Sequence, residues 1–144
     1  MSFIKKQSIG FYLTILAVIF GLVGITAYFI NCNTAYFSNQ GVHMGLVVCI
    51  IVGIIFEIIY ILGSEKDSTK IWLDAFPVLS GILLMVGFVI FVSLRVNSIA
   101  TILSFERNAQ TMSDLSSAIV GMVCCLLGVL FTIISSFFRI VKEK

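Results

Sequence analysis

The sequence predicts an all-α fold, a bundle of four membrane-spanning helices that alternate in direction. Its 144 residues are 60% hydrophobic and only 11% charged, whereas soluble domains are about 45–50% apolar and about 25% charged. Four apolar runs each approach the roughly 20 residues that a helix needs to cross a bilayer. Because lipid offers no partners for open backbone groups, each run must be helical. The sequence therefore predicts an integral membrane protein.

The expected helices share one domain, which covers residues 1–144. They are 9–30, 42–62, 76–96 and 118–140. A chain of this length is too short for two membrane domains. The first run follows Lys5 and Lys6 but exceeds the roughly 7–15 apolar residues of a signal peptide. We therefore expect it to remain as the first helix.

Lysine and arginine residues predict the orientation, because they are enriched in cytoplasmic flanks. Seven of the nine lie at the two termini or in the second connection: Lys5, Lys6, Lys66, Lys70, Arg139, Lys142 and Lys144. Arg95 and Arg107 lie on the other side. Both termini are therefore expected in the cytoplasm. Arg95, at the outer end of the third helix, is expected to extend its charged group to water.

The two outer connections differ in length. Residues 31–41 are rich in amides and turn formers, which predicts a compact polar loop. Residues 97–117 are expected to form the longest connection, and the third helix either projects beyond the bilayer or bends along its surface. A hydroxyl at Ser113 and an acid at Asp114 predict the start of the fourth helix there.

Small residues recur at helical spacing on three of the four runs. The row on the first is Gly10, Thr14, Ala17, Gly21, Gly24 and Tyr28; on the second Gly45, Cys49, Gly53 and Glu57; on the fourth Ser117, Gly121, Cys125, Gly128, Thr132 and Ser135. Such rows let helix backbones approach closely in lipid. We expect them to be seams inside the bundle, with a face for a partner helix as the alternative.

Glu57 is the one full charge well inside the apolar run 42–62. By helix rise it lies about 8 Å from the inner edge of the hydrocarbon. Thr14, Ser80 and Ser135 are expected at a similar depth, so the four residues form a hypothetical polar binding layer. Three interpretations stay open: a structural glutamate that is neutral or reaches toward the interface, a proton- or cation-coupled transport site, and a contact with a partner or with lipid.

Several function classes lack support in the sequence. The net charge of +2, with no basic run longer than two residues, argues against nucleic-acid binding. Nucleotide-binding, hydrolase and metalloprotease motifs are absent, so no catalytic residue, cofactor or enzyme activity is expected. A lone His43 beside Cys32 does not supply the four ligands of a structural zinc site. No metal site is therefore predicted.

Two stretches carry a resemblance to other proteins. Residues 31–37 (Asn-Cys-Asn-Thr-Ala-Tyr-Phe) and residues 108–121 resemble segments of uncharacterised four-span membrane proteins of Gram-positive and gut bacteria. The similar layout extends over most of the chain. The resemblance implies a bacterial cytoplasmic membrane, and because those proteins have no assigned activity it implies no functional residue.

These observations favour a non-enzymatic accessory or scaffold subunit that lies in the bilayer and contacts a membrane-protein partner or a second copy. It would bind through its helix seams or its outer loops. The expected contact residues in the loops are Asn33, Tyr36, Asn39, Asn108 and Gln110. The alternative is a small oligomeric transporter or channel that uses Glu57. A membrane enzyme is the third class, and no motif favours it.

Overall fold

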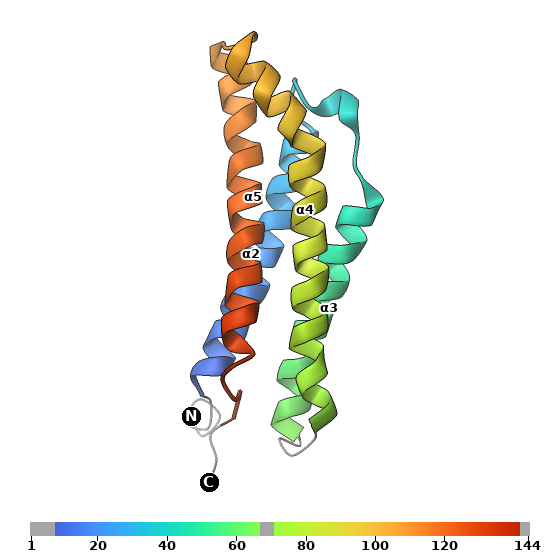
Figure 1. Ribbon diagram of the computed structural model, residues 1–144, viewed down its shortest axis with the longest axis vertical. Coiled ribbons are helices and arrows are strands. Elements are labelled where there is room, and N and C mark those ends of the chain that lie inside the picture. The colour runs from blue at the N-terminus through green and yellow to red at the C-terminus, as the bar shows by residue number, and fades with distance from the viewer. Residues whose placement is uncertain (1–7, 67–70, 142–144) are drawn as a thin grey trace.

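The computed structural model describes residues 8–66 and 71–141, and within them the fold is all-α, as predicted. The long helices are α2 (Ile9–Cys32), α3 (Met44–Lys66), α4 (Ala75–Ser104) and α5 (Ala109–Ser135), with short 3-10 helices η1 (Ser38–Gln40) and η2 (Ile71–Asp74). Across the described residues, four helical segments are long and apolar enough to cross a membrane. They lie alongside one another in an elongated bundle (Figure 1).

The two ends of the bundle are distinguished by their connections. At the end that we call the Arg95 end, residues 33–43 join α2 to α3 and residues 105–108 join α4 to α5. Tyr60, Leu73 and Ile140 pack together near the opposite end. Five of the lysines that predict orientation, Lys5, Lys6, Lys70, Lys142 and Lys144, lie outside the described residues.

Helix α5 begins earlier than the sequence predicted. Its N-cap is Asn108, whose side chain accepts a hydrogen bond from the Thr111 N–H at 2.9 Å. In return the Thr111 hydroxyl accepts from the Asn108 N–H at 3.0 Å. This reciprocal capping satisfies two amide groups that a helix start leaves free. The predicted start at Ser113 and Asp114 is therefore wrong, and so is the boundary at residue 118.

Helix α4 continues to Ser104, well past the predicted end at residue 96. Its last turns lean over the start of α5 (Figure 1). Whether this end lies beyond the bilayer or along its surface stays a prediction. Because α4 and α5 both extend into it, the long connection predicted over 97–117 shrinks to residues 105–108.

The chain after α5 folds back on the start of α2. Helix α5 ends at Ser135, short of the predicted residue 140, and the Ser8 N–H donates to the Ile140 carbonyl at 2.8 Å. Gly10 permits this approach, since a Cβ atom there would lie 2.6 Å from the carbonyl oxygens of Phe138 and Arg139.

The predicted seams on α2 and α5 are confirmed. Every member of the α2 row is buried, and so is every member of the α5 row except the half-buried Ser117. A Cβ atom at Gly24 would lie 2.6 Å from the Cys125 sulfur. Small residues therefore let these two backbones approach closely, as packing in lipid requires.

The seam predicted on α3 is only half right. Gly53 and Glu57 are buried, but Gly45 is exposed and Cys49 is half-buried. Each step of four residues rotates about 40° beyond a full turn, so three steps carry Gly45 about 120° away from Glu57. The buried stripe instead alternates steps of four and three. It comprises Leu46, Ile50, Gly53, Glu57, Tyr60 and Ser64.

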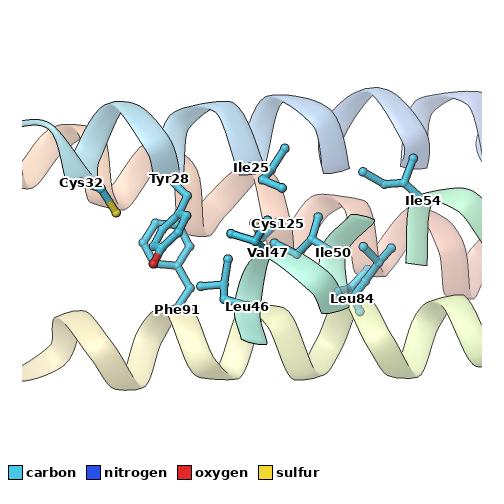
Figure 2. Packing of buried hydrophobic residues seen from close by; sticks show 11 residues of the cluster. Ile25, Tyr28, Cys32, Leu46, Val47, Ile50, Ile54, Leu84, Phe91 and Cys125 are labelled. Atoms are coloured by element: carbon cyan, nitrogen blue, oxygen red, sulfur yellow. The ribbon is translucent and has the colours of Figure 1, made fainter. Parts of the chain in front are cut away.

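The main core lies midway along the bundle and draws side chains from all four long helices. Figure 2 shows Ile25 and Tyr28 of α2 facing Leu46 and Ile50 of α3, with Leu84, Phe91 and Cys125 completing the cluster. A smaller cluster at the Arg95 end contains Phe37, Ile102, Leu115 and Ala118. The main core separates the two polar sites described next.

Candidate functional site

The first polar site surrounds Arg95, whose side chain is only 1% exposed. The expectation that it extends to water is therefore wrong. Its Nε–H donates to the Asn31 side-chain oxygen at 2.9 Å, and its other nitrogens donate to the Gln40 amide oxygen and the Cys32 sulfur. The guanidinium carbon also lies 4.9 Å from the centre of the Phe37 ring. The end of α2 and the first connection thus enclose it.

Asn31 links this site to α5. Its amide nitrogen donates to the Asp114 carbonyl at 3.2 Å and to the Ser117 hydroxyl at 3.0 Å. The Asp114 carboxyl group, itself buried, accepts from the Tyr36 N–H at 2.9 Å and from the Gln110 side chain at 2.8 Å. We call Asn31, Cys32, Gln40, Arg95, Asp114 and Ser117 the Arg95 network. It ties the first connection to both α4 and α5.

The loop residues predicted as a contact surface divide between surface and structure. Asn33 and Asn39 are exposed, and Tyr36 is half-buried. Asn108 and Gln110 are also exposed, but Asn108 caps α5 and Gln110 donates to Asp114. The side chains of Asn108 and Gln110 therefore have structural roles in addition to any contact with a partner.

Two further features mark the surface at the Arg95 end. Partial burial, together with the neighbouring Glu106 carboxyl group, raises the pKa of the Tyr36 phenol above its ordinary value. The phenol is therefore neutral at physiological pH. Phe105, which the sequence analysis did not single out, is 86% exposed.

The Arg95 network was missed because Asn31 and Cys32 were assigned to a loop, whereas α2 includes both. One signal was available. The row on α2 alternates steps of four and three, and its next step after Tyr28 is Asn31. Extending the row would have placed an amide at the buried end of the seam.

The second polar site surrounds Glu57, which is completely buried. Among the described residues, neither carboxyl oxygen has a hydrogen-bond partner, and neither does the Thr132 hydroxyl. The side chains of Thr132 and Ser80 both lie near the carboxyl group. The Ser80 hydroxyl itself donates to the Gly53 carbonyl at 2.8 Å. A buried acid therefore lies beside two hydroxyl groups, one of which already donates its hydrogen to a backbone carbonyl.

Thr14 and Ser135, the other members of the predicted polar layer, are buried, but each donates a hydrogen bond to a carbonyl of its own helix. The Thr14 hydroxyl donates to the Gly10 carbonyl at 2.8 Å, and the Ser135 hydroxyl donates to the Thr132 carbonyl at 2.9 Å. The structure thus brings Ser80 to Glu57 and adds Thr132 from α5. Thr132 belongs to the predicted α5 row, but the depth estimate favoured Ser135, its neighbour one turn away.

The described cysteines are all free, and the described residues contain no cluster of His, Cys, Asp or Glu suited to a metal ion. The side chains of the two sites carry hydroxyl, amide, guanidinium and carboxyl groups and, at Cys32, a thiol. Comparisons with protein-family models, with curated proteins and with solved structures found no match.

Proposed function

We propose that the chain is a multi-pass protein of a bacterial cell membrane, with helices that alternate in direction and both termini in the cytoplasm. In this orientation the Arg95 end faces outward. The protein acts as a non-enzymatic accessory or scaffold subunit. Its partner is another membrane protein or a second copy, which it contacts with the surface at the Arg95 end.

The observation that supports this proposal is the buried Arg95 network. In the first connection, Gln40 accepts a hydrogen bond from Arg95, and the Tyr36 N–H donates to the Asp114 carboxyl group. In the second connection, the Glu106 carbonyl accepts from the Thr111 hydroxyl. A surface that is ordered before binding loses less conformational entropy when a partner docks. The exposed groups on it combine amides with an aromatic ring, Phe105, and aromatic residues are enriched in protein interfaces.

Site-specific photocrosslinking in native membranes tests this proposal. A photoreactive residue replaces Phe105 in one variant and Ile71 in a matched control. Each side chain is 86% exposed, and they flank opposite ends of α4. We expect a discrete adduct from position 105 and none from position 71. Failure to form an adduct at position 105, or the same adduct from both positions, would contradict the proposal.

A second candidate function is a small oligomeric transporter or channel for protons or other cations. The observation that favours it is Glu57, a fully buried carboxyl group without a hydrogen-bond partner among the described residues. Ionisable groups inside a membrane frequently mark ion or proton pathways. Four helices are few to enclose a pathway, so an assembly of several copies would form it.

Flux into vesicles tests this second candidate. The wild-type chain and Glu57→Gln are reconstituted separately, and proton and cation uptake are followed under an imposed gradient. Transport requires flux that the substitution abolishes, because glutamine neither gains nor loses a proton at this position. Equal flux from the two proteins, or no flux from either, rules it out.

A further inference from the structure

The oxygen atoms around Glu57 form a buried cluster without enough hydrogen atoms. Both carboxyl oxygens and the Thr132 hydroxyl lack hydrogen-bond partners among the described residues. We infer that Glu57, Thr132 and Ser80 form a proton-binding site, in which the protonated carboxyl group donates to a neighbouring hydroxyl oxygen. This inference goes beyond the proposed scaffold function, because it concerns occupancy by a proton and holds whether or not the protein transports anything.

Counting donors and acceptors favours the neutral acid. A carboxylate only accepts, with about four lone-pair sites, whereas a protonated carboxyl group also donates once. The Ser80 hydroxyl donates its single hydrogen to the Gly53 carbonyl, so toward Glu57 it can only accept. Thr132 has one hydrogen to offer. A charged Glu57 would therefore receive at most one hydrogen bond from these two hydroxyls, while a protonated Glu57 can both donate to one and accept from Thr132.

The surrounding charges do not offset a buried carboxylate. Described α2 carries no Lys, Arg, Asp or Glu, and the cation of α4, Arg95, is engaged in its own network at the other end of the core. The acid of α5, Asp114, is also in that network. Tyr60, one turn from Glu57, interacts with it electrostatically and is itself an acid. An unpaired carboxylate in such a place is costly, and binding a proton removes that cost.

Of the other charged groups in the described residues, Glu106 and Arg107 lie at the Arg95 end. Four lie toward the Tyr60 end, outside the buried cluster: Glu65 and Lys66 of α3, Asp74 of η2 and Arg139 after α5, all exposed. Lys66 is nine residues from Glu57, or about 13 Å along the helix. Hydronium in the water near these residues is the source of the proton. One O–H bond of hydronium breaks, leaving water, as the new O–H bond forms on a carboxylate oxygen.

A metal cation fits the same cluster less well than a proton. Two carboxyl oxygens and two hydroxyls provide four oxygen atoms, whereas a hard cation such as Ca²⁺ takes about 6–8 oxygen ligands. The two hydroxyls are also neutral, and one is already held by Gly53. The proton is therefore the ligand that the site accommodates.

Infrared spectroscopy of the full chain in lipid vesicles at neutral pH tests the inference. We expect a carbonyl-stretch band of a protonated carboxylic acid that Glu57→Gln removes. Thr132→Val should shift this band to higher frequency, because the acid loses a hydrogen-bond partner. Thr14→Val is the matched control: its threonine is equally buried but bonds to its own helix, so the band should not move.

Labelling with an apolar carbodiimide, which reacts with protonated carboxyl groups, provides a second measurement. Glu57 should be modified at neutral pH and lose this reactivity as the pH rises, while the exposed Glu65 and Glu106 remain unmodified. The inference is overturned if Glu57→Gln removes no acid band and Glu57 resists labelling. It is also overturned if Thr132→Val and Thr14→Val give the same spectrum, or if sodium or potassium at constant pH abolishes the band, which would indicate a cation site. Neither measurement depends on a partner or on flux.

Discussion

At the scale of single residues, Arg95 and Glu57 show two ways of burying an ionisable side chain. Arg95 is surrounded by neutral acceptors, namely the oxygens of Asn31 and Gln40 and the sulfur of Cys32. The ring of Phe37 adds a cation–π contact. Glu57 has no such partner among the described residues. The protein therefore supplies hydrogen-bond acceptors to the charge of Arg95, whereas Glu57 avoids the cost of a buried charge by binding a proton.

Replacing Arg95 tests how far the Arg95 end depends on its network. Arg95→Ala leaves the buried oxygen of Asn31 without its donor, and a buried group left unsatisfied costs about 1–3 kcal/mol. Arg95→Lys should restore little, because a lysine ammonium lacks the planar fork that reaches several acceptors at once. We expect both variants to unfold at lower temperature, as followed by circular dichroism.

The same two variants should expose Cys32, which is 5% accessible in the intact network. Maleimide labelling of Cys32 would then accelerate, while labelling of the half-buried Cys124, located elsewhere in the bundle, provides the internal control. A lysine variant with wild-type stability and wild-type Cys32 reactivity would show that the hydrogen-bond network is not needed.

At the scale of helices, close backbone approach controls how the bundle packs. Along α2 and α5 the small residues follow alternating steps of four and three, so they stay on one face. On α3 the glycine and cysteine row follows steps of four only, and it leaves the buried face after two turns. Step pattern therefore decides whether a row of small residues becomes a seam.

Alanine at two glycines separates close approach from helix propensity. At Gly24 a Cβ atom would lie 2.6 Å from the Cys125 sulfur, so Gly24→Ala should destabilise the bundle by about 1–3 kcal/mol through overpacking. At Gly81 the nearest atom would lie 3.5 Å away, and Gly81→Ala should be neutral or stabilise by up to about 1 kcal/mol. Unfolding in detergent measures both variants, and equal effects would contradict a seam at Gly24.

At the scale of the whole molecule, the two polar sites lie at different levels of one bundle. The Arg95 network closes the end formed by residues 33–43 and 105–108, and the central core separates it from Glu57. We propose that the surface at the Arg95 end contacts a partner and that the interior near Glu57 binds a proton. The first of these proposals depends on which end of the bundle faces outward.

Cysteine labelling on intact cells tests that orientation. Phe105→Cys and Ile71→Cys place equally exposed thiols at opposite ends of α4. With the termini in the cytoplasm, a membrane-impermeant maleimide should label position 105 and leave position 71 unlabelled until the cells are opened. The wild-type chain, with its four native cysteines, gives the background. Labelling of position 71 alone on intact cells would reverse the proposed topology.

Local sequence determined the helices and much of their packing. The apolar runs predicted the four long helices because each must satisfy its backbone internally. The rows that begin at Gly10 and Ser117 predicted two seams because small residues permit close approach. The boundaries moved where a specific interaction intervened. Asn108 with Thr111 advanced the start of α5.

Only the tertiary structure decided the surroundings of the charged groups. Arg95 is bonded to Asn31, 64 residues away in the sequence, and the group that approaches Glu57 from α5 is Thr132 rather than Ser135. The partners of a buried group depend on which side chains the neighbouring helices bring to the same level. The rotation and register of the helices decide this, and amino-acid composition does not specify either. The sequence by itself thus determined four apolar helices and a carboxyl group among them, and the packing of those helices decided that Arg95 is solvated by amides while Glu57 is left with two hydroxyls.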